Sequence, residues 1–350
     1  MHLVTRSGAG FLAAFMMALV TAPAPEALAS SETYQSAYER GDYTTAFSLA
    51  EPLAMRGDAD AQNALGIMYD LGQGVARDYA KAAAWYQRAA EQGHVSAQID
   101  LGVLYLRGDW ATRDPAIAVE WFEKAARSGH PRAQYNLATA YLYGEGVSQS
   151  YPKALTLLRQ AADQQFPEAL YQLGMCYLNA IGVEQDFKLA RQHFEKASLL
   201  GVVAAAANLG SMYYNGTGVE QDFAKAYEWY TIGVARGDPL SQNSIGSMYA
   251  NGQGVERDYA AAESWFKLAA EQGYVNAQAN LGELYANGHG ISASKIEAYK
   301  WLSLAADGGN IYALQKLNSL ILTMDSDEMI EGDGRIQDWK ARAEPSAQQQ

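Results

Sequence analysis

Cysteine is nearly absent from this chain of 350 residues, in which Cys176 is the sole example. One cysteine has no intramolecular partner, so disulfide bonds cannot hold the fold together. Cys176 also lies far from the N-terminus, which excludes a lipid-modified N-terminal cysteine. Packed side chains must therefore stabilise the chain.

Basic residues are also scarce: 26 lysines and arginines stand against 39 acidic residues, for a net charge of −13. Such an excess of negative charge disfavours binding to nucleic acid or to anionic membrane surfaces. Beyond the N-terminal segment, no stretch is apolar for long enough to cross a bilayer. We therefore expect neither nucleic acid nor a membrane-inserted state for the mature chain.

The N-terminal segment has the features of a secretory signal. Arg6 precedes a short apolar stretch from Phe11 to Val20, and Ala27-Leu28-Ala29 stands before Ser30. This pattern predicts a signal peptide over residues 1–29, cleaved after Ala29 and without a lipobox. The alternative, a retained anchor helix, requires a longer apolar segment. We expect a periplasmic or secreted protein.

Motifs that carry chemistry are missing as well. The sequence contains no H-E-x-x-H, no paired C-x-x-C and no nucleophile elbow, and its five histidines do not cluster. Three S-x-x-K matches begin at Ser150, Ser264 and Ser292, but none has the S-D-N or K-T-G partners of serine β-lactamases. We therefore assign no catalytic residue, no metal site and no cofactor.

What the sequence does contain is a repeat with a constant step of 36 residues. A fixed period in this range is typical of a solenoid, in which each unit buries its apolar face only by stacking on its neighbours. The recurring pentapeptides, LGIMY and its variants, begin at Leu65, Leu101, Leu137, Leu173, Leu209, Ile245 and Leu281.

Each repeat holds two helical patterns, here named helix A and helix B. In the first helix A, from about Asp60 to Leu71, Ala61, Leu65, Met68 and Tyr69 share one side and are expected to face the core. A glycine recurs inside this helix at a cost of about 1 kcal/mol relative to alanine, which implies close approach of the neighbouring helix backbone.

Helix B begins at an N-cap residue and carries alanine and tryptophan at fixed positions. The expected N-caps are Asp78, Asp114, Ser150, Asp186, Asp222, Asp258 and Ser294. Glycine follows the helix in every repeat except at Gln165. Helices A and B are joined by Gly-x-Gly-Val, which we interpret as a structural turn, because the strand that a phosphate-binding loop requires is absent.

The motifs LG-x-x-Y, G-x-G-V-x-x-D and W-(Y/F)-x-x-A-A resemble the Sel1-like repeat family, a tetratricopeptide-like group. The first full unit shows all three as LGIMY, GQGVARD and WYQRAA. The resemblance implies an all-α fold, an α/α solenoid with a right-handed superhelix of 36-residue helix-turn-helix repeats. The expected parts are a half-repeat cap at 30–57, seven repeats at 58–309, capping helices at 310–343 and a disordered tail at 344–350.

The side of helix A opposite the core is the surface that the fold leaves for a partner. In the central repeats it is apolar and aromatic, which is typical of an interaction site, and a polar column beside it suits an extended peptide. The alternative is that these side chains only pack neighbouring helices together. The candidate partner-binding residues on helix A are Ile99, Leu106, Tyr135, Asn136, Leu142, Tyr171, Gln172, Met175, Leu178, Asn208 and Tyr214. Trp110, which replaces the second glycine of the turn in the second repeat, is a further candidate if it is exposed; the alternative is that it packs locally.

The resemblance also implies a role. Similar proteins act as adaptors in envelope signalling, in cell-wall or polysaccharide regulation, or in host interaction. We expect an exported scaffold, monomeric on its own, that binds a protein or peptide partner in its concave groove and is not an enzyme. The alternative is a β-lactam-recognising or β-lactamase-like envelope enzyme.

Overall fold

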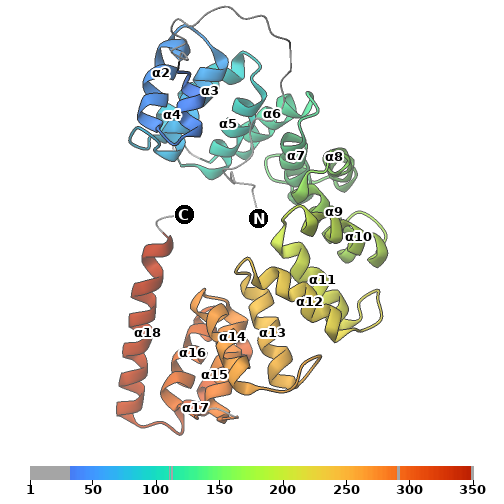
Figure 1. Cartoon of the computed structure of the whole chain (residues 1–350), viewed down its shortest axis with the longest axis vertical. Coiled ribbons are helices and arrows are strands. Elements are labelled where there is room, and N and C mark those ends of the chain that lie inside the picture. The colour runs from blue at the N-terminus through green and yellow to red at the C-terminus, as the bar shows by residue number, and fades with distance from the viewer. Residues whose placement is uncertain (1–31, 110, 112, 290–291, 348–350) are drawn as a thin grey trace, which may run out of the picture. The chain divides into compact units, whose positions relative to one another are not determined.

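The computed structural model describes residues 32–347 with the exception of 110, 112, 290 and 291. These residues form 18 helices and no strand (Figure 1). The chain divides into two compact units, residues 1–184 and 185–350, and we describe each by itself. The expectation of an all-α solenoid built from repeated helix pairs is confirmed.

The first unit contains nine helices in the part of the chain that the structure describes. They are α1 (Tyr34–Glu39), α2 (Tyr43–Met55), α3 (Ala59–Leu71), α4 (Tyr79–Glu91), α5 (Val95–Arg107), α6 (Pro115–Ala126), α7 (Pro131–Tyr143), α8 (Tyr151–Asp163) and α9 (Pro167–Asn179). Helices A are α3, α5, α7 and α9, and each of α3, α5 and α7 packs most extensively on the helix B that follows it.

The second unit continues the pattern over its described residues. Its helices are α10 (Phe187–Leu199), α11 (Val203–Asn215), α12 (Phe223–Val234), α13 (Pro239–Asn251), α14 (Tyr259–Glu271), α15 (Val275–Asn287), α16 (Lys295–Asp307), α17 (Ile311–Ile321) and α18 (Ser326–Ala347). Helices A are α11, α13, α15 and α17. The first three of these pack on α12, α14 and α16.

The N-caps of helix B stand where the sequence predicts them. Aspartate carboxylates accept hydrogen bonds from backbone N–H groups of the first turn, as Asp78 does from Lys81 at 3.0 Å. This bond satisfies a donor that has no partner within the helix. Ser294 caps α16 in the same way, whereas Ser150 precedes α8 without a side-chain bond.

The buried residues lie on the helix faces that the sequence predicts, with one difference at the tryptophan register of helix B. The helix A residues Ala61, Leu65 and Met68 are fully buried, and Tyr69 packs at the edge of the core. The alanine register of helix B is fully buried in all eight of its occurrences. In the first two repeats the residue after the tryptophan is buried more deeply than the tryptophan itself: Tyr86 and Phe122 are fully buried, whereas Trp121 is only half-buried.

In several repeats the recurrent glycine of helix A has a different cause from the one expected. A side-chain carbon on Gly66 would lie 2.4 Å from the ring of Tyr86, and one on Gly102 would lie 2.6 Å from the ring of Phe122. In these repeats the close neighbour is an aromatic side chain of helix B, because its ring reaches across the gap between the two helices. The expected backbone approach occurs at Gly282, where a side-chain carbon would lie 3.0 Å from the backbone nitrogen of Leu302.

The Gly-x-Gly-Val segment is a turn that touches the preceding repeat. Gly72 ends α3 in the left-handed conformation, with φ of 69°. Gly74 has φ of 72°, and a side-chain carbon there would lie 2.3 Å from the carbonyl oxygen of Tyr43 at the start of α2. Positive φ and this contact both require glycine. Trp110 stands in the register of Gly74 and lies outside the described residues.

A glutamine register that the sequence analysis overlooked links successive repeats. Gln62 on α3 donates to the Ala54 carbonyl at the end of α2 at 3.0 Å and accepts from Gln92 after α4 at 2.7 Å. The same donation joins Gln98 to Ala90 at 3.1 Å. Because each buried amide satisfies a carbonyl at a helix end, it pairs groups that would otherwise lack a partner.

The C-terminal helices differ from a repeat. α18 packs on α16, where the rings of Trp301 and Trp339 lie 6.5 Å apart and Tyr299 donates to Asp333 at 3.0 Å. Gly332 permits this approach, because a side-chain carbon there would lie 2.4 Å from the Tyr299 ring. α18 runs to Ala347, past residue 343, where we expected the capping helices to end.

Candidate partner-binding surface

On α5 and α7 the candidate residues are buried. Ile99 and Leu106 on α5, and Tyr135, Asn136 and Leu142 on α7, are each at most 6% exposed. Burial raises the pKa of Tyr135 to about 12, and its ring packs 5.6 Å from that of Phe166. At these positions the structure shows side chains packed between helices. Their contact with a partner stays a prediction.

On α9 the candidate residues are accessible. Tyr171, Gln172, Met175 and Leu178 are each half-buried. Tyr171, Met175 and Leu178 lie on the side of the helix away from Leu173 and Cys176, whereas Gln172 lies nearer the core and hydrogen-bonds the Cys176 side chain. Leu173 is 1% exposed and holds α9 against the core. Within the first unit, α9 therefore presents the predicted surface most openly.

A group of buried polar side chains lies between α5 and α7. The Arg132 guanidinium donates to the Asp100 carboxylate at 2.9 Å, and both side chains are largely buried. Burial, followed by the charge of Arg132, lowers the pKa of His130. The amide of Asn136 is 2% exposed, and neither of its polar atoms has a hydrogen-bond partner among the described residues.

In the second unit, the candidate residues of α11 take part in contacts of their own. The Asn208 amide donates to the Ala204 carbonyl within the helix at 2.9 Å. The Tyr214 hydroxyl donates to the Gln253 side chain at 2.5 Å, and its ring lies 5.3 Å from Phe223. Tyr214 therefore supports the following turn, and it remains half-buried. Trp110, the remaining candidate, lies outside the described residues.

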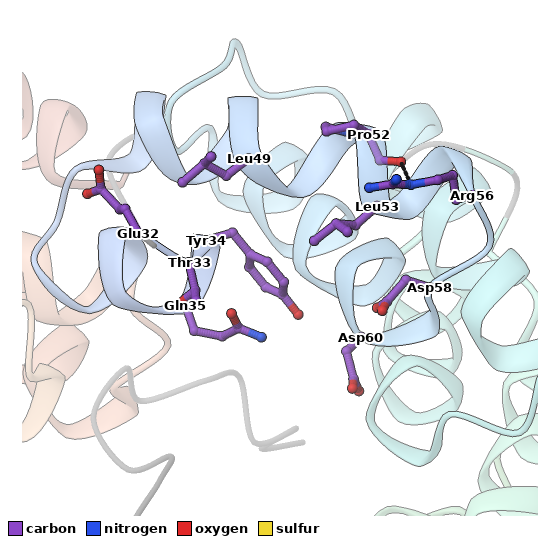
Figure 2. A pocket seen from close by; sticks show the side chains of 10 residues that line it. All are labelled: Glu32, Thr33, Tyr34, Gln35, Leu49, Pro52, Leu53, Arg56, Asp58 and Asp60. Atoms are coloured by element: carbon purple, nitrogen blue, oxygen red, sulfur yellow. Dashed lines mark hydrogen bonds between the residues drawn. The ribbon is translucent and has the colours of Figure 1, made fainter. Parts of the chain in front are cut away.

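Two open cavities of about 440 Å³ lie away from this surface. The first lies between α1, α2 and the start of α3, with Tyr34 pointing into it toward the side where Asp58 and Asp60 stand (Figure 2). Burial, followed by the charges of Asp60 and Asp58, raises the pKa of Tyr34 to about 12. The second, in the other unit, is lined by Arg191, Tyr213 and residues 219–222 and 225.

The residues weighed for chemistry have structural contacts. His94 caps α5 by accepting from Ala97 at 3.1 Å, and its other ring nitrogen lies 3.1 Å from Asp60. Ser264 donates to Ala260 within α14, and the Lys153 ammonium lies 4.9 Å from the centre of the Tyr141 ring. Within the described residues, no group of three or more histidine, cysteine or acidic side chains could hold a metal ion.

No helix among the described residues combines the length and the apolar character needed to cross a bilayer. The predicted signal peptide at 1–29 lies outside the described residues, so its cleavage remains an expectation.

The ion pair of Asp100 and Arg132 was missed at the sequence level. It occurs in a single repeat, because the residues 36 positions before Arg132 and after it are Ser96 and Glu168. A comparison of repeats with one another could have marked Arg132 as an exception, but it could not have supplied the partner.

Comparison with known proteins agrees with this architecture. The Sel1 repeat model matches seven consecutive segments: 59–94, 95–130, 131–166, 167–202, 203–238, 239–274 and 275–310. No curated protein sequence matches the chain.

Two solved structures are similar over most of their length. A Sel1 repeat protein from Oxalobacter formigenes is 33% identical, with a TM-score of 0.66, over 82% of this chain and 87% of that one. The protective antigen c5321 of uropathogenic Escherichia coli, which has an SLR fold, is 27% identical with a TM-score of 0.54, over 90% of this chain and 79% of that one.

Sel1 repeat proteins generally mediate protein–protein interactions and are generally non-enzymatic scaffolds. The motifs, the helix pairs of constant step and the seven matched segments all agree with that class. This chain belongs to the Sel1 repeat family.

Proposed function

We propose that this chain is an exported adaptor that binds an extended segment of a protein partner over α7 and α9 of the first unit. The single observation that carries the proposal is the amide of Asn136, which is buried without a hydrogen-bond partner among the described residues. Leaving such a group unsatisfied costs about 1 to 3 kcal/mol. Because the amide is 2% exposed, neighbouring side chains must move aside before a partner's main chain can pair with it, and that pairing would then recover the free energy.

The neighbouring surface suits the same partner. Gln172 on α9 occupies the register of Asn136 in the next repeat, 36 residues later, and is half-buried, so an extended chain could meet a second amide there beside its bond to Cys176. Tyr171, Met175 and Leu178 supply half-buried apolar area beside it. Tyrosine is enriched among residues that dominate binding energy, and methionine adapts to irregular partners.

The proposal also includes the location of the protein and the pathway in which it acts. The signal-like segment supports a periplasmic or secreted location, and the family resemblance favours envelope signalling, cell-wall or polysaccharide regulation, or host interaction. Cell fractionation followed by N-terminal sequencing tests the location. A mature chain that begins at Ser30 outside the cytoplasm supports export, whereas an uncleaved cytoplasmic chain contradicts it.

Crosslinking in the producing cell, followed by mass spectrometry, tests the surface. The test variant carries Tyr171→Ser, Met175→Ser and Leu178→Ser, because these side chains are accessible. A matched control replaces three exposed residues on α10 and α12, Leu199, Leu200 and Ile232, with serine. A partner captured by the wild type and the control but lost from the test variant supports the proposal. Equal capture by all three contradicts it.

Asn136→Leu separates a binding role from a structural one. If the amide is kept for a partner, leucine should leave the melting temperature unchanged or raise it, because an unpaired buried amide is removed. Capture of the partner should fall at the same time. A lower melting temperature with undiminished capture would assign Asn136 to the fold alone.

A further inference from the structure

One face of α17 is uncovered among the described residues of the second unit. The last helix A has no helix B beside it, because α18 packs on α16 instead. Ala313, Leu317 and Leu320 turn inward to the core formed with Ala279 and Leu302. The opposite side of α17 keeps its apolar residues in solvent.

These residues form one stripe at helical spacing. Ile311 is 73% exposed, Leu314 46% and Leu322 87%, and Ile321 is half-buried beside them. At 100° per residue they fall on one side of the helix, with Asn318 in the middle of the stripe. Contiguous exposed apolar surface usually marks an interaction site.

The register of the stripe indicates what would cover it. Asn318 stands 36 residues after Gly282, and a side-chain carbon on Gly282 would lie 2.7 Å from Leu302 of helix B. The stripe is therefore centred on the position where every complete repeat receives its second helix. An α-helix that packs alongside α17 would continue an interface that the chain already builds.

We infer that a second copy of this chain covers α17, with the two α17 helices packed against each other about a twofold axis. The stripe contains four apolar residues and one asparagine and carries no charge. It can therefore face an identical stripe without like-charge repulsion, whereas the net charge of −13 opposes contact over the rest of the chain. Twofold dimers pair the same patch on both subunits.

Sedimentation of the full chain, purified from an exporting bacterial host, tests the dimer over about a hundredfold range of concentration, because association follows mass action. The wild type should be dimeric at the upper end, and a variant with Ile311→Glu and Leu322→Glu should be monomeric throughout. Leu199→Glu, at a residue 85% exposed on α10, should leave the dimer intact. A wild type that is monomeric at every concentration would overturn the inference.

A single cysteine at the centre of the stripe tests the pairing of the helices. Cys176 is fully buried, so it is replaced by serine only to remove background, and Asn318→Cys places a thiol on the expected axis. Mild oxidation should then give a disulfide-linked dimer. A variant that stays dimeric in solution but does not crosslink through residue 318 would contradict the pairing of the two α17 helices.

Discussion

Gly210 on α11 and Tyr230 on α12 are complementary in size: a side-chain carbon on Gly210 would lie 2.6 Å from the Tyr230 ring. The third repeat has both residues changed together. Ala138 stands in the glycine register and Leu158 in the aromatic one, and both are fully buried. A larger helix A residue thus accompanies a smaller helix B residue in that repeat, although the seventh repeat keeps Gly282 opposite Leu302.

Gly210→Ala should therefore destabilise the fold, although alanine is the better helix former by about 1 kcal/mol. Overpacking against Tyr230 should lower the free energy of unfolding by about 1 to 3 kcal/mol, as measured by urea denaturation.

Two further variants test the cause of that loss. Adding Tyr230→Leu should recover part of it, because the pair then matches that of the third repeat. Gly334→Ala on α18, where no atom lies within 4 Å of the added carbon, should raise the free energy of unfolding by about 1 kcal/mol. A stabilising Gly210→Ala would contradict the contact with the ring.

Leu173→Ala removes a side chain that is 1% exposed at the core face of α9. Lost burial and the cavity left behind should lower the free energy of unfolding by about 2 to 5 kcal/mol. Because repeats are coupled to their neighbours, the melting transition should shift as a whole. Circular dichroism melting measures it. An unchanged melting temperature would disprove the assigned core face of helix A.

In the part of the chain that the structure describes, two residues other than glycine have positive φ: Gln165 at 59° and Ala180 at 56°. The left-handed conformation costs about 1 to 2 kcal/mol for such residues, and glycine would relieve this cost at some loss of chain entropy. Gln165→Gly and Ala180→Gly should each raise the free energy of unfolding by about 0.5 to 1 kcal/mol.

Ala235 provides the control for these two variants. It ends α12 with φ of −57°, so Ala235→Gly adds flexibility without relieving strain. Chemical denaturation should show a loss of about 0.5 to 1 kcal/mol there. If all three glycine variants destabilised the chain alike, positive φ at Gln165 and Ala180 would not be a source of strain.

Alkaline pH should weaken the fold through buried acidic groups. Burial raises the pKa of the Cys176 thiol to about 11 and that of Tyr135 to about 12. The unfolded chain therefore loses these protons first, and stability that is complete below about pH 9 should decline between about pH 9 and 12.

The slope of the free energy of unfolding against pH measures this effect. Tyr135→Phe should make the decline shallower by up to about 3 kcal/mol over the range, because phenylalanine cannot ionise. Cys176→Ala should do the same at the lower end. Unchanged slopes in both variants would show that other groups control the alkaline response.

The sequence predicted most of what is repeated and local. The helix pairs and the buried alanine register recur from repeat to repeat, and aspartate or serine stands at the N-cap of each helix B. Because a chance match would not recur at a constant step of 36 residues, these features can be recognised in the sequence. What it could not predict depends on single contacts in space. The pairing of Asp100 with Arg132 occurs once, and the packing of α18 on α16 depends on Trp339 meeting Trp301.

How deeply the candidate residues are buried could not be predicted from the repeat pattern. One helical register contains both buried Tyr135 and half-buried Tyr171, because exposure at that register depends on which side chains the adjacent helices supply. Periodicity fixes the side of the helix on which a residue lies. It does not fix how deeply the neighbouring repeats cover it.

The glutamine that links helix A to the end of the preceding helix B has a consequence for the evolution of the chain. Gln62, Gln98 and Gln278 each donate a hydrogen bond to a carbonyl 8 residues earlier. Donor and acceptor therefore both lie in the short segment that joins one repeat to the next. Recombination that inserts or deletes a whole 36-residue unit recreates this boundary at the new junction. An insertion or deletion inside these 8 residues would separate donor from acceptor, so the contact favours changes in array length that leave this segment whole.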